Sequence, residues 1–139
     1  MIFGNCLQNV AFLKPAYQST DQASNVASRA VDGKSSTMSR TVWQKNPYWQ
    51  TNLGSVYEIK TVKLHLNEKK LNKMKNFILR IRNSDKLTWQ YKYHGIPSVS
   101  TLTIHVPEGA ATGNKVKVLI KGNSRQLELK EVEVLAFAA

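Results

Sequence analysis

The sequence has few features of a membrane protein or of a disulfide-stabilised one. Its single cysteine, Cys6, excludes a disulfide within one chain and a zinc site built from cysteines. No apolar run approaches the ~20 residues that a membrane-spanning helix needs. The opening residues MIFGNCLQNVAFL lack the basic stretch and the uninterrupted apolar core of a signal peptide, so we do not interpret them as one.

Acidic residues are scarce as well. The 139-residue chain has nine aspartates and glutamates against 20 lysines and arginines, which gives a formal net charge of +11. This balance favours anionic partners, among them sulfated or sialylated glycans, acidic lipids and nucleic acid. Basic residues are densest between residues 60 and 82, where Glu68 is the only acid. The simplest explanation of such a run is a solvent-exposed surface without a binding role.

Signatures of catalysis and of specific nucleic-acid binding are missing too. The sequence has no Gly-x-Ser-x-Gly, no phosphate-binding loop, no His-Glu-x-x-His and no paired Cys and His pattern. RNP-like, helix-turn-helix and zinc-finger patterns are also missing. We therefore predict a protein that is not an enzyme and that binds no nucleic acid specifically.

What the sequence does have is apolar residues at every second position in short segments. The pattern recurs in residues 61–66, 76–83, 101–106 and 115–121. It predicts strands with one buried face, and turn-forming residues such as Asp32-Gly33 and Asn46-Pro47 separate them. The basic segment 67–77 predicts a loop or a short helical turn. Many short strands with frequent turns predict an all-β, antiparallel sandwich or barrel, with residues 1–139 as a single domain.

The last predicted strand changes its alternation. Apolar residues alternate in residues 126–129 and again in 132–134, but with opposite parity, so we predict a β-bulge near Lys130 and Glu131. The slip places Glu131 on the buried side, where a carboxylate needs a partner. The candidates are a lysine or arginine, a set of backbone amides, or a hard cation shared with Asp32.

Five blocks of sequence carry a family resemblance. In chain order they are NVAFLKPAYQST, ASRAVDGKSST, NPYWQTNLGSVYEIKTVKL, RIRNS and LKEVEVLA. Together they resemble the F-type lectin domain, the fucose-binding branch of the discoidin-like or coagulation-factor C-terminal-type β-sandwiches, over nearly the whole chain. The resemblance implies an eight-stranded jelly-roll sandwich, a structural calcium near one end, and a glycan pocket formed by loops at the mouth of the sandwich.

The resemblance implies a calcium site in and around ASRAVDGKSST, residues 27–37. Carried over by position, Asp32 and Glu131 are the side-chain ligands and Thr37 supplies a hydroxyl. The remaining ligands are backbone carbonyls, those of Arg29, Lys34 and Lys130. Calcium takes 6 to 8 oxygen ligands at about 2.3–2.6 Å, which suits this mixed set. The alternative is an Asp-Gly turn whose carboxylate caps backbone amides, with Glu131 bonded to a lysine.

The resemblance also implies a sugar site. F-type lectins place a histidine before an aromatic cluster, an Arg-x-Asp on a later loop, and a further basic residue after it. The predicted sugar-binding residues in this chain are Arg40, Trp43, Asn67, Lys69 and Lys73. Arg40 stands at the histidine position, where its guanidinium can donate hydrogen bonds but also suits a carboxylate or a sulfate. The vicinal cysteines of the family have no equivalent here.

We therefore expect a noncatalytic, lectin-like domain that binds a fucosylated or otherwise different glycan. The alternative is an adhesion module for an anionic glycan, an acidic surface or a protein ligand, in which the fucose pocket has been lost. Single lectin pockets are weak, so we expect action through oligomers or tandem copies. Because lectins of this type are usually secreted, we expect an extracellular location as a processed domain.

Overall fold

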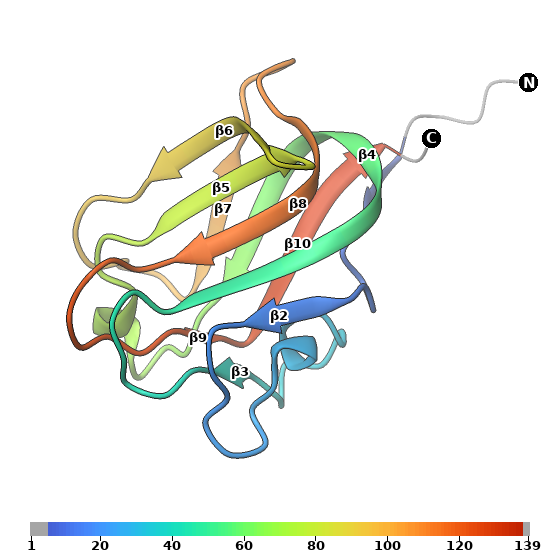
Figure 1. The fold of residues 1–139 in the computed structure, drawn as a ribbon. Helices are drawn as coiled ribbons and strands as arrows, with labels where there is room; N and C mark the ends of the chain where they lie inside the picture. The colour runs from blue at the N-terminus through green and yellow to red at the C-terminus, as the bar shows by residue number, and fades with distance from the viewer. Residues whose placement is uncertain (1–5, 138–139) are drawn as a thin grey trace, which may run out of the picture.

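Two layers of antiparallel strands pack face to face in the computed structural model, which describes residues 6–137 (Figure 1). The strands of these layers are β1 (Leu7–Asn9), β2 (Ala16–Gln18), β4 (Tyr48–His65), β5 (Ile78–Asn83), β6 (Lys86–Lys92), β7 (Thr101–His105), β8 (Thr112–Leu119) and β10 (Glu131–Phe137). One layer has the order β1, β10, β4, β7, and the other has the order β2, β4, β8, β5, β6. The predicted all-β sandwich of about eight strands is confirmed.

Strand β4 belongs to both layers because it turns a corner. Its first residues pair with β8 and β2, and its last residues pair with β10 and β7. The pairing with β8 is irregular between Asn52 and Tyr57. Gly54 lies there with a φ of +82°, a left-handed conformation that glycine adopts without steric cost. One continuous strand therefore closes the sandwich along this edge.

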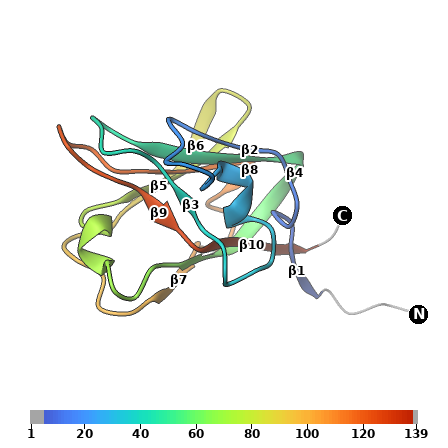
Figure 2. The same cartoon turned by 90° about the horizontal axis from the view of Figure 1, so that it is seen from below.

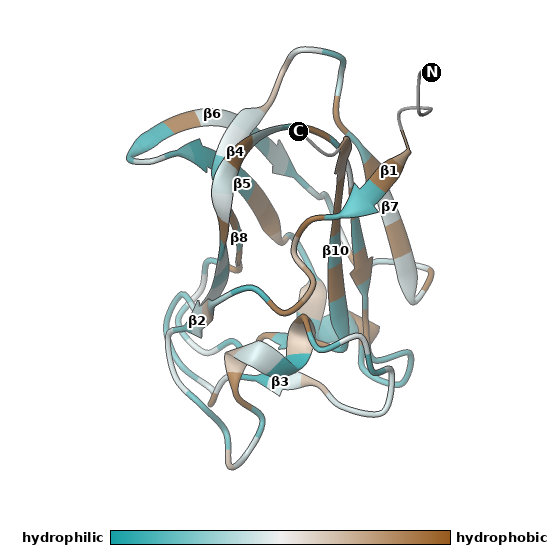
Figure 3. Ribbon diagram, turned by 90° about the vertical axis from the view of Figure 1, so that its right-hand side faces the viewer, coloured by the Kyte–Doolittle hydropathy of each residue, from teal (hydrophilic) through white to brown (hydrophobic). Residues whose placement is uncertain are grey.

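Apolar side chains fill the space between the layers. Hydrophobic and hydrophilic residues alternate along strands such as β10 (Figure 3), as period-two burial requires. The predicted inward residues are buried in all four alternating segments, among them Leu64, Leu79 and Val116. Trp49 and Phe77 are the largest fully buried side chains. No helix within residues 6–137 is long and apolar enough to cross a membrane.

Short elements gather at one end of the sandwich (Figure 2). They are the 3-10 helices η1 (Ala27–Ala30) and η2 (Leu71–Met74) and the two-residue strands β3 (Ser39–Arg40) and β9 (Glu128–Leu129). β3 and β9 pair with each other in a small antiparallel sheet. Residues 67–77 form a loop, and η2 within this loop is a short helical turn. The two predictions made for this segment therefore both hold.

The prediction of a β-bulge near Lys130 and Glu131 is wrong, because the chain passes from one sheet to another at this point. The chain bends at Lys130, which separates β9 from β10, and the two strands belong to different sheets. The register shift of β10 lies further on, between Leu135 and Ala136. A change of sheet reverses the parity as a bulge would, which is why the sequence pattern did not distinguish them. The burial of Glu131 is confirmed.

Candidate functional site

A buried carboxylate lies at the centre of the end formed by β3 and β9. The antiparallel register places Arg40 directly opposite Glu128. Glu128 is only 2% exposed, and Arg40 Nε lies 3.3 Å from its Oε1 atom. The contact is an ion pair by distance, although this buried N–H makes no aligned hydrogen bond. Arg40 is also held by its Nη1 atom, which donates to Gln22 Oε1 at 3.3 Å.

The loop after β4 brings two further donors to the same carboxylate. Lys73 forms an ion pair with Glu128 Oε1 and donates to Gln126 Oε1. Asn67 Nδ2 donates to Glu128 Oε2 at 3.2 Å. Burial opposes the charge on Glu128, but the hydrogen bonds from Lys73 and Asn67 and the charges of Lys73 and Arg40 outweigh it. They hold the pKa of Glu128 below its ordinary value, so the carboxylate is ionised at neutral pH.

An exposed indole borders this group of polar side chains. Trp43 is 58% exposed, as predicted for a residue near the ligand mouth. Lys73 Nζ lies 5.4 Å from the centre of its ring, within cation–π range. The backbone beside Lys73 is fixed by Arg125, whose Nη2 atom donates to the carbonyls of Lys73 at 3.3 Å and Lys75 at 2.6 Å.

The structure brings together four of the five predicted sugar-binding residues. We call this set the sugar cluster: Arg40, Trp43, Asn67 and Lys73. Lys69 is not part of it, because its side chain is exposed and only its backbone N–H bonds the loop, to Asn67 Oδ1 at 3.1 Å. The sequence reasoning missed Glu128 and Gln126. Their signal is weak: two polar residues flanking a leucine look like the solvated face of an ordinary strand.

A second group of oxygens lies in the loop of residues 29–37. Thr37 Oγ1 donates to Asp32 Oδ2 at 2.6 Å and also lies 3.4 Å from the carbonyl oxygen of Arg29 and 3.3 Å from that of Lys34. A hydroxyl has one proton, so it can satisfy only one of these three acceptors at a time. Asp32 Oδ1 accepts the backbone N–H of Lys34 at 2.9 Å. The loop thus holds more acceptors than donors.

Glu131 extends this group from β10. It is 9% exposed, and its Oε2 atom accepts the backbone N–H of Gly33 at 3.0 Å. Its Oε1 atom is buried, and no group of the described residues forms a hydrogen bond with it. Burial, with the nearby carboxylates of Asp32 and Glu133, raises the pKa of Glu131 to about 7. Of the candidate partners, a backbone amide serves one oxygen, and the other is left unsatisfied.

Gly33 makes this approach geometrically possible. Its φ is +75°, and a Cβ atom there would lie 2.7 Å from the ring of Phe12. A larger residue here would be strained by the positive φ and would push the Phe12 ring aside, whereas glycine allows its N–H to point at Glu131.

The donor chemistry of this loop fits calcium. Within residues 6–137 no group of three or more His, Cys, Asp and Glu side chains is placed to hold a metal ion. A site here would instead combine two carboxylates with a hydroxyl and backbone carbonyls, which calcium accepts and softer metals do not favour. The backbone of the predicted ligand Lys130 is anchored by its N–H, which donates to the carbonyl oxygen of His65 at 2.8 Å.

These features, a discoidin-type sandwich with a polar cluster and an exposed indole at one end, define a lectin-like domain. The model of the F5/F8 type C family, described as a NedA-like, galactose-binding domain, matches residues 29–118, and the chain belongs to this family. The predicted resemblance to the F-type lectin and discoidin-like fold is thereby confirmed. No curated protein matches the chain significantly.

Solved structures of lectin domains share the fold over nearly the whole chain. The lectin domain of Lectinolysin complexed with Lewis B antigen is 27% identical, with a TM-score of 0.86 over 94% of this chain and 98% of that one. A fucose-binding module of Streptococcus pneumoniae is 21% identical, with a TM-score of 0.87 over 95% and 100%. The serum fucolectin of striped bass, Morone saxatilis, is 25% identical, with a TM-score of 0.83 over 94% of this chain and 49% of that one.

Proposed function

We propose that this chain is a noncatalytic domain that binds a glycan of the fucose type at the sugar cluster. The observation that carries the proposal is the convergence of Arg40, Lys73 and Trp43 on one exposed end, with both cations oriented by buried Glu128. Relatives described as fucose-binding, or complexed with Lewis B antigen, share the fold. The striped bass relative is a serum protein, which supports the expectation of an extracellular location.

The charge at the cluster favours a neutral ligand over a strongly anionic one. Arg40 and Lys73 carry two positive charges, and Glu128 neutralises one of them inside the same cluster. N–H groups that are already oriented bind sugar hydroxyls without a further cost of ordering the side chains. The exposed face of Trp43 offers an apolar surface for the C–H face of a sugar ring.

We further propose that calcium occupies the loop of residues 29–37. Asp32, Thr37 and Glu131 would hold it with side-chain oxygens, together with the carbonyls of Arg29 and Lys34. The unsatisfied Glu131 Oε1 atom and the excess of acceptors around Thr37 support this assignment. The ion would fix the loop against β10 and would not contact the sugar. Lys130 remains a candidate carbonyl ligand from the family resemblance alone.

A glycan array at physiological salt tests the sugar proposal. Wild type is compared with Trp43→Ala and Arg40→Ala at a temperature at which circular dichroism shows each variant to be folded, because loss of the Arg40–Glu128 ion pair lowers stability. Loss of the Trp43 ring should weaken selective fucoside binding about tenfold, a loss of the size of one aromatic contact. Lys69→Ala is the control, because it removes an exposed charge from the loop that carries Lys73 but lies outside the sugar cluster, and it should leave binding unchanged.

The other outcomes separate the remaining interpretations. Binding only to sulfated or sialylated glycans that collapses with added salt would overturn the neutral-sugar proposal and favour an adhesion module for anionic ligands. A blank array would overturn carbohydrate binding and leave a protein ligand. Repeating the array with a calcium chelator tests the calcium proposal separately. Loss of calcium should lower the stability of the fold and should weaken glycan binding only as a consequence of that lower stability. Analytical ultracentrifugation tests whether copies associate.

A further inference from the structure

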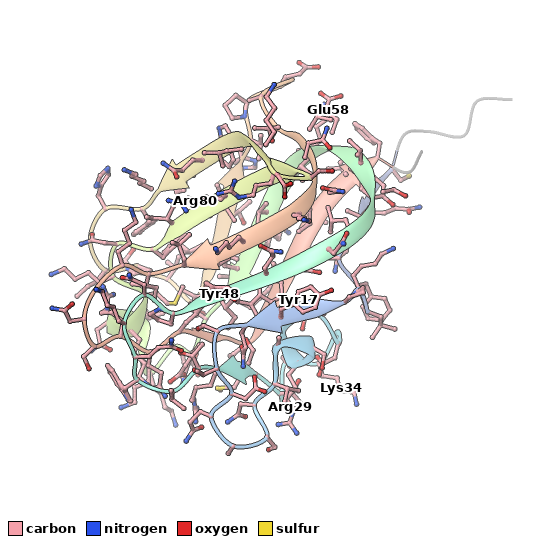
Figure 4. All side chains as sticks on the ribbon, in the orientation of Figure 1. Tyr17, Arg29, Lys34, Tyr48, Glu58 and Arg80 are labelled. Carbon is pink, nitrogen blue, oxygen red and sulfur yellow. The ribbon has the colours of Figure 1, made fainter. Side chains whose placement is uncertain are left out.

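Four basic side chains form a compact group on the outer face of the layer that contains β5 and β8. Arg80 pairs directly with Lys117, and Arg82 pairs directly with Lys115. Successive outward residues of a strand and directly paired residues of its neighbour share one face. The side chains of Arg80 and Tyr48 lie on this face in Figure 4. We call these four residues the basic block: Arg80, Arg82, Lys115 and Lys117.

Within residues 6–137, the hydrogen-bond and cation–π partners of the basic block are neutral groups. Arg80 Nε donates to Gln90 Oε1 at 2.8 Å, and Arg82 Nη1 donates to the carbonyl oxygen of Asp85 at 3.3 Å. Lys117 Nζ lies 4.4 Å from the centre of the Tyr48 ring. Among the residues that the structure describes, the basic groups within ion-pair distance of a carboxylate lie elsewhere, at Arg40, Lys60, His65 and Lys73. The charge of the block is therefore not compensated within the described chain.

Like charges placed directly opposite each other across two strands are destabilising. Partial burial, with the charges of Arg80 and Arg82, lowers the pKa of Lys117. The neighbouring outward positions on the same face hold neutral amides: Gln50 pairs with Lys117, Asn52 with Lys115 and Gln90 with Arg80. Neutral side chains would thus fit the block as well, without the repulsion. An external anion would relieve it.

We propose that the basic block is a second binding surface, separate from the sugar cluster, and that it binds a sulfated polysaccharide. Charge complementarity supports an anionic ligand, and the amides of Gln50, Asn52 and Gln90 border the cations with groups that bond sugar hydroxyls. The guanidinium group of each arginine can donate two parallel N–H bonds to two oxygens of one sulfate group. This inference does not depend on the sugar cluster being functional.

Two features of the face disfavour nucleic acid as the occupant. The ring of Tyr48 is covered by Lys117 Nζ, so it offers no open platform on which a base can stack. Double-stranded DNA is read by a helix or a two-stranded ribbon that enters a groove, and the basic block lies on the face of a sheet of several strands. A polysaccharide chain lying across the strands requires neither feature.

The test measures heparin affinity by isothermal titration calorimetry at physiological salt. The double variant Arg80→Gln with Lys117→Gln should lose about a hundredfold or more in affinity, since two charge-assisted hydrogen bonds are lost. The matched control is Lys69→Gln with Lys70→Gln, which lowers the net charge equally on an exposed loop and should change affinity less than threefold by screened long-range charge alone. Removing the repulsion should leave the melting temperature of the block variant unchanged or higher.

The outcomes are distinct. Equal losses in both double variants, or a loss only in the loop variant, would overturn the proposal, because net charge or the loop would then carry the binding. Desulfated heparin should bind far more weakly than heparin, and equal binding would also overturn it. A single-stranded oligonucleotide that binds as tightly as heparin and depends equally on the block would replace the polysaccharide as the ligand. Fucoside binding should be unaffected, so failure here is separable from failure at the sugar cluster.

Discussion

Glu128 and Glu131 lie three residues apart, both are buried, and their surroundings differ completely. Glu128 receives Lys73, Arg40 and Asn67, whereas Glu131 receives one backbone N–H and leaves an oxygen unsatisfied. The pKa of Glu128 is lowered and the pKa of Glu131 is raised to about 7. The bend at Lys130 turns them toward different neighbours.

The difference shows which of the two buried carboxylates is neutralised by the protein's own basic side chains. A buried carboxylate is stable as an anion when donors or a cation compensate it, and otherwise it tends to take up a proton. At Glu128 the chain supplies the cations itself, those of Arg40 and Lys73. The carboxylate is therefore compensated without a ligand, and the remaining N–H groups of these two side chains can bind one. At Glu131 the described chain supplies one backbone N–H and no cation, and the calcium proposed above would supply the missing positive charge. Each half of the comparison can be tested.

The largest effect is expected on removing the charge of Glu128. Glu128→Gln leaves Arg40 and Lys73 close together without their shared counter-charge, and breaking a buried pair in this way costs roughly 3 kcal/mol. Urea unfolding at pH 7 measures the loss. Lys60 and Glu58 form an exposed pair, so Glu58→Gln is the control and should change stability by less than about 1 kcal/mol. A loss below that size for Glu128→Gln would mean that the cluster is not the compensated site described.

Calcium should stabilise the protein by an effect of similar or smaller size. An ion that binds only the folded state adds about 2.7 kcal/mol at a concentration of 100 times its dissociation constant. Thermal unfolding with calcium and with a chelator measures the difference. Glu131→Gln and Asp32→Asn should each abolish it, while Glu133→Gln should retain it. If calcium still stabilises Glu131→Gln, Glu131 is not a calcium ligand, and the proposed difference between the two glutamates is wrong.

The smallest effect is a dependence on pH. Because the folded-state pKa of Glu128 is lowered, its contribution is fully present above the unfolded-state pKa and is lost as pH falls through the folded-state pKa. The stability gap between wild type and Glu128→Gln should therefore narrow in acid, below about pH 4.5. Urea midpoints measured across this range give the gap. A gap that stays constant would show that Glu128 is not stabilised as an anion.

Much of the fold followed from the sequence, because burial on one face imposes a period of two. Residues 61–66 and 115–121 were assigned to strands with the correct inward side chains for this reason. The corner of β4 and the bend at Lys130 depend on how distant strands pair, and no local pattern encodes that. The bulge predicted at Lys130 was wrong because a parity reversal is the same for a bulge and for a change of sheet.

The candidate sites were predicted less completely. The family resemblance pointed to Arg40 and Lys73, since motif positions can be counted along a chain. Glu128 was missed because its partners come from segments more than 50 residues away: the β3–β9 register brings Arg40 to it, and the loop after β4 brings Lys73 and Asn67. Lys69 was included by position, but its side chain is exposed and does not reach the cluster.

The corner in β4 also makes the two layers one cooperative unit. Local opening normally exposes amides in separate units with separate free energies. Here the layer of β10 and the layer of β8 share the continuous strand β4. If one layer opens, β4 moves, and its hydrogen bonds to the other layer are disturbed as well. Amides at both ends of β4 should consequently exchange with solvent deuterium at similar rates, set by global unfolding and not by the fraying of one layer.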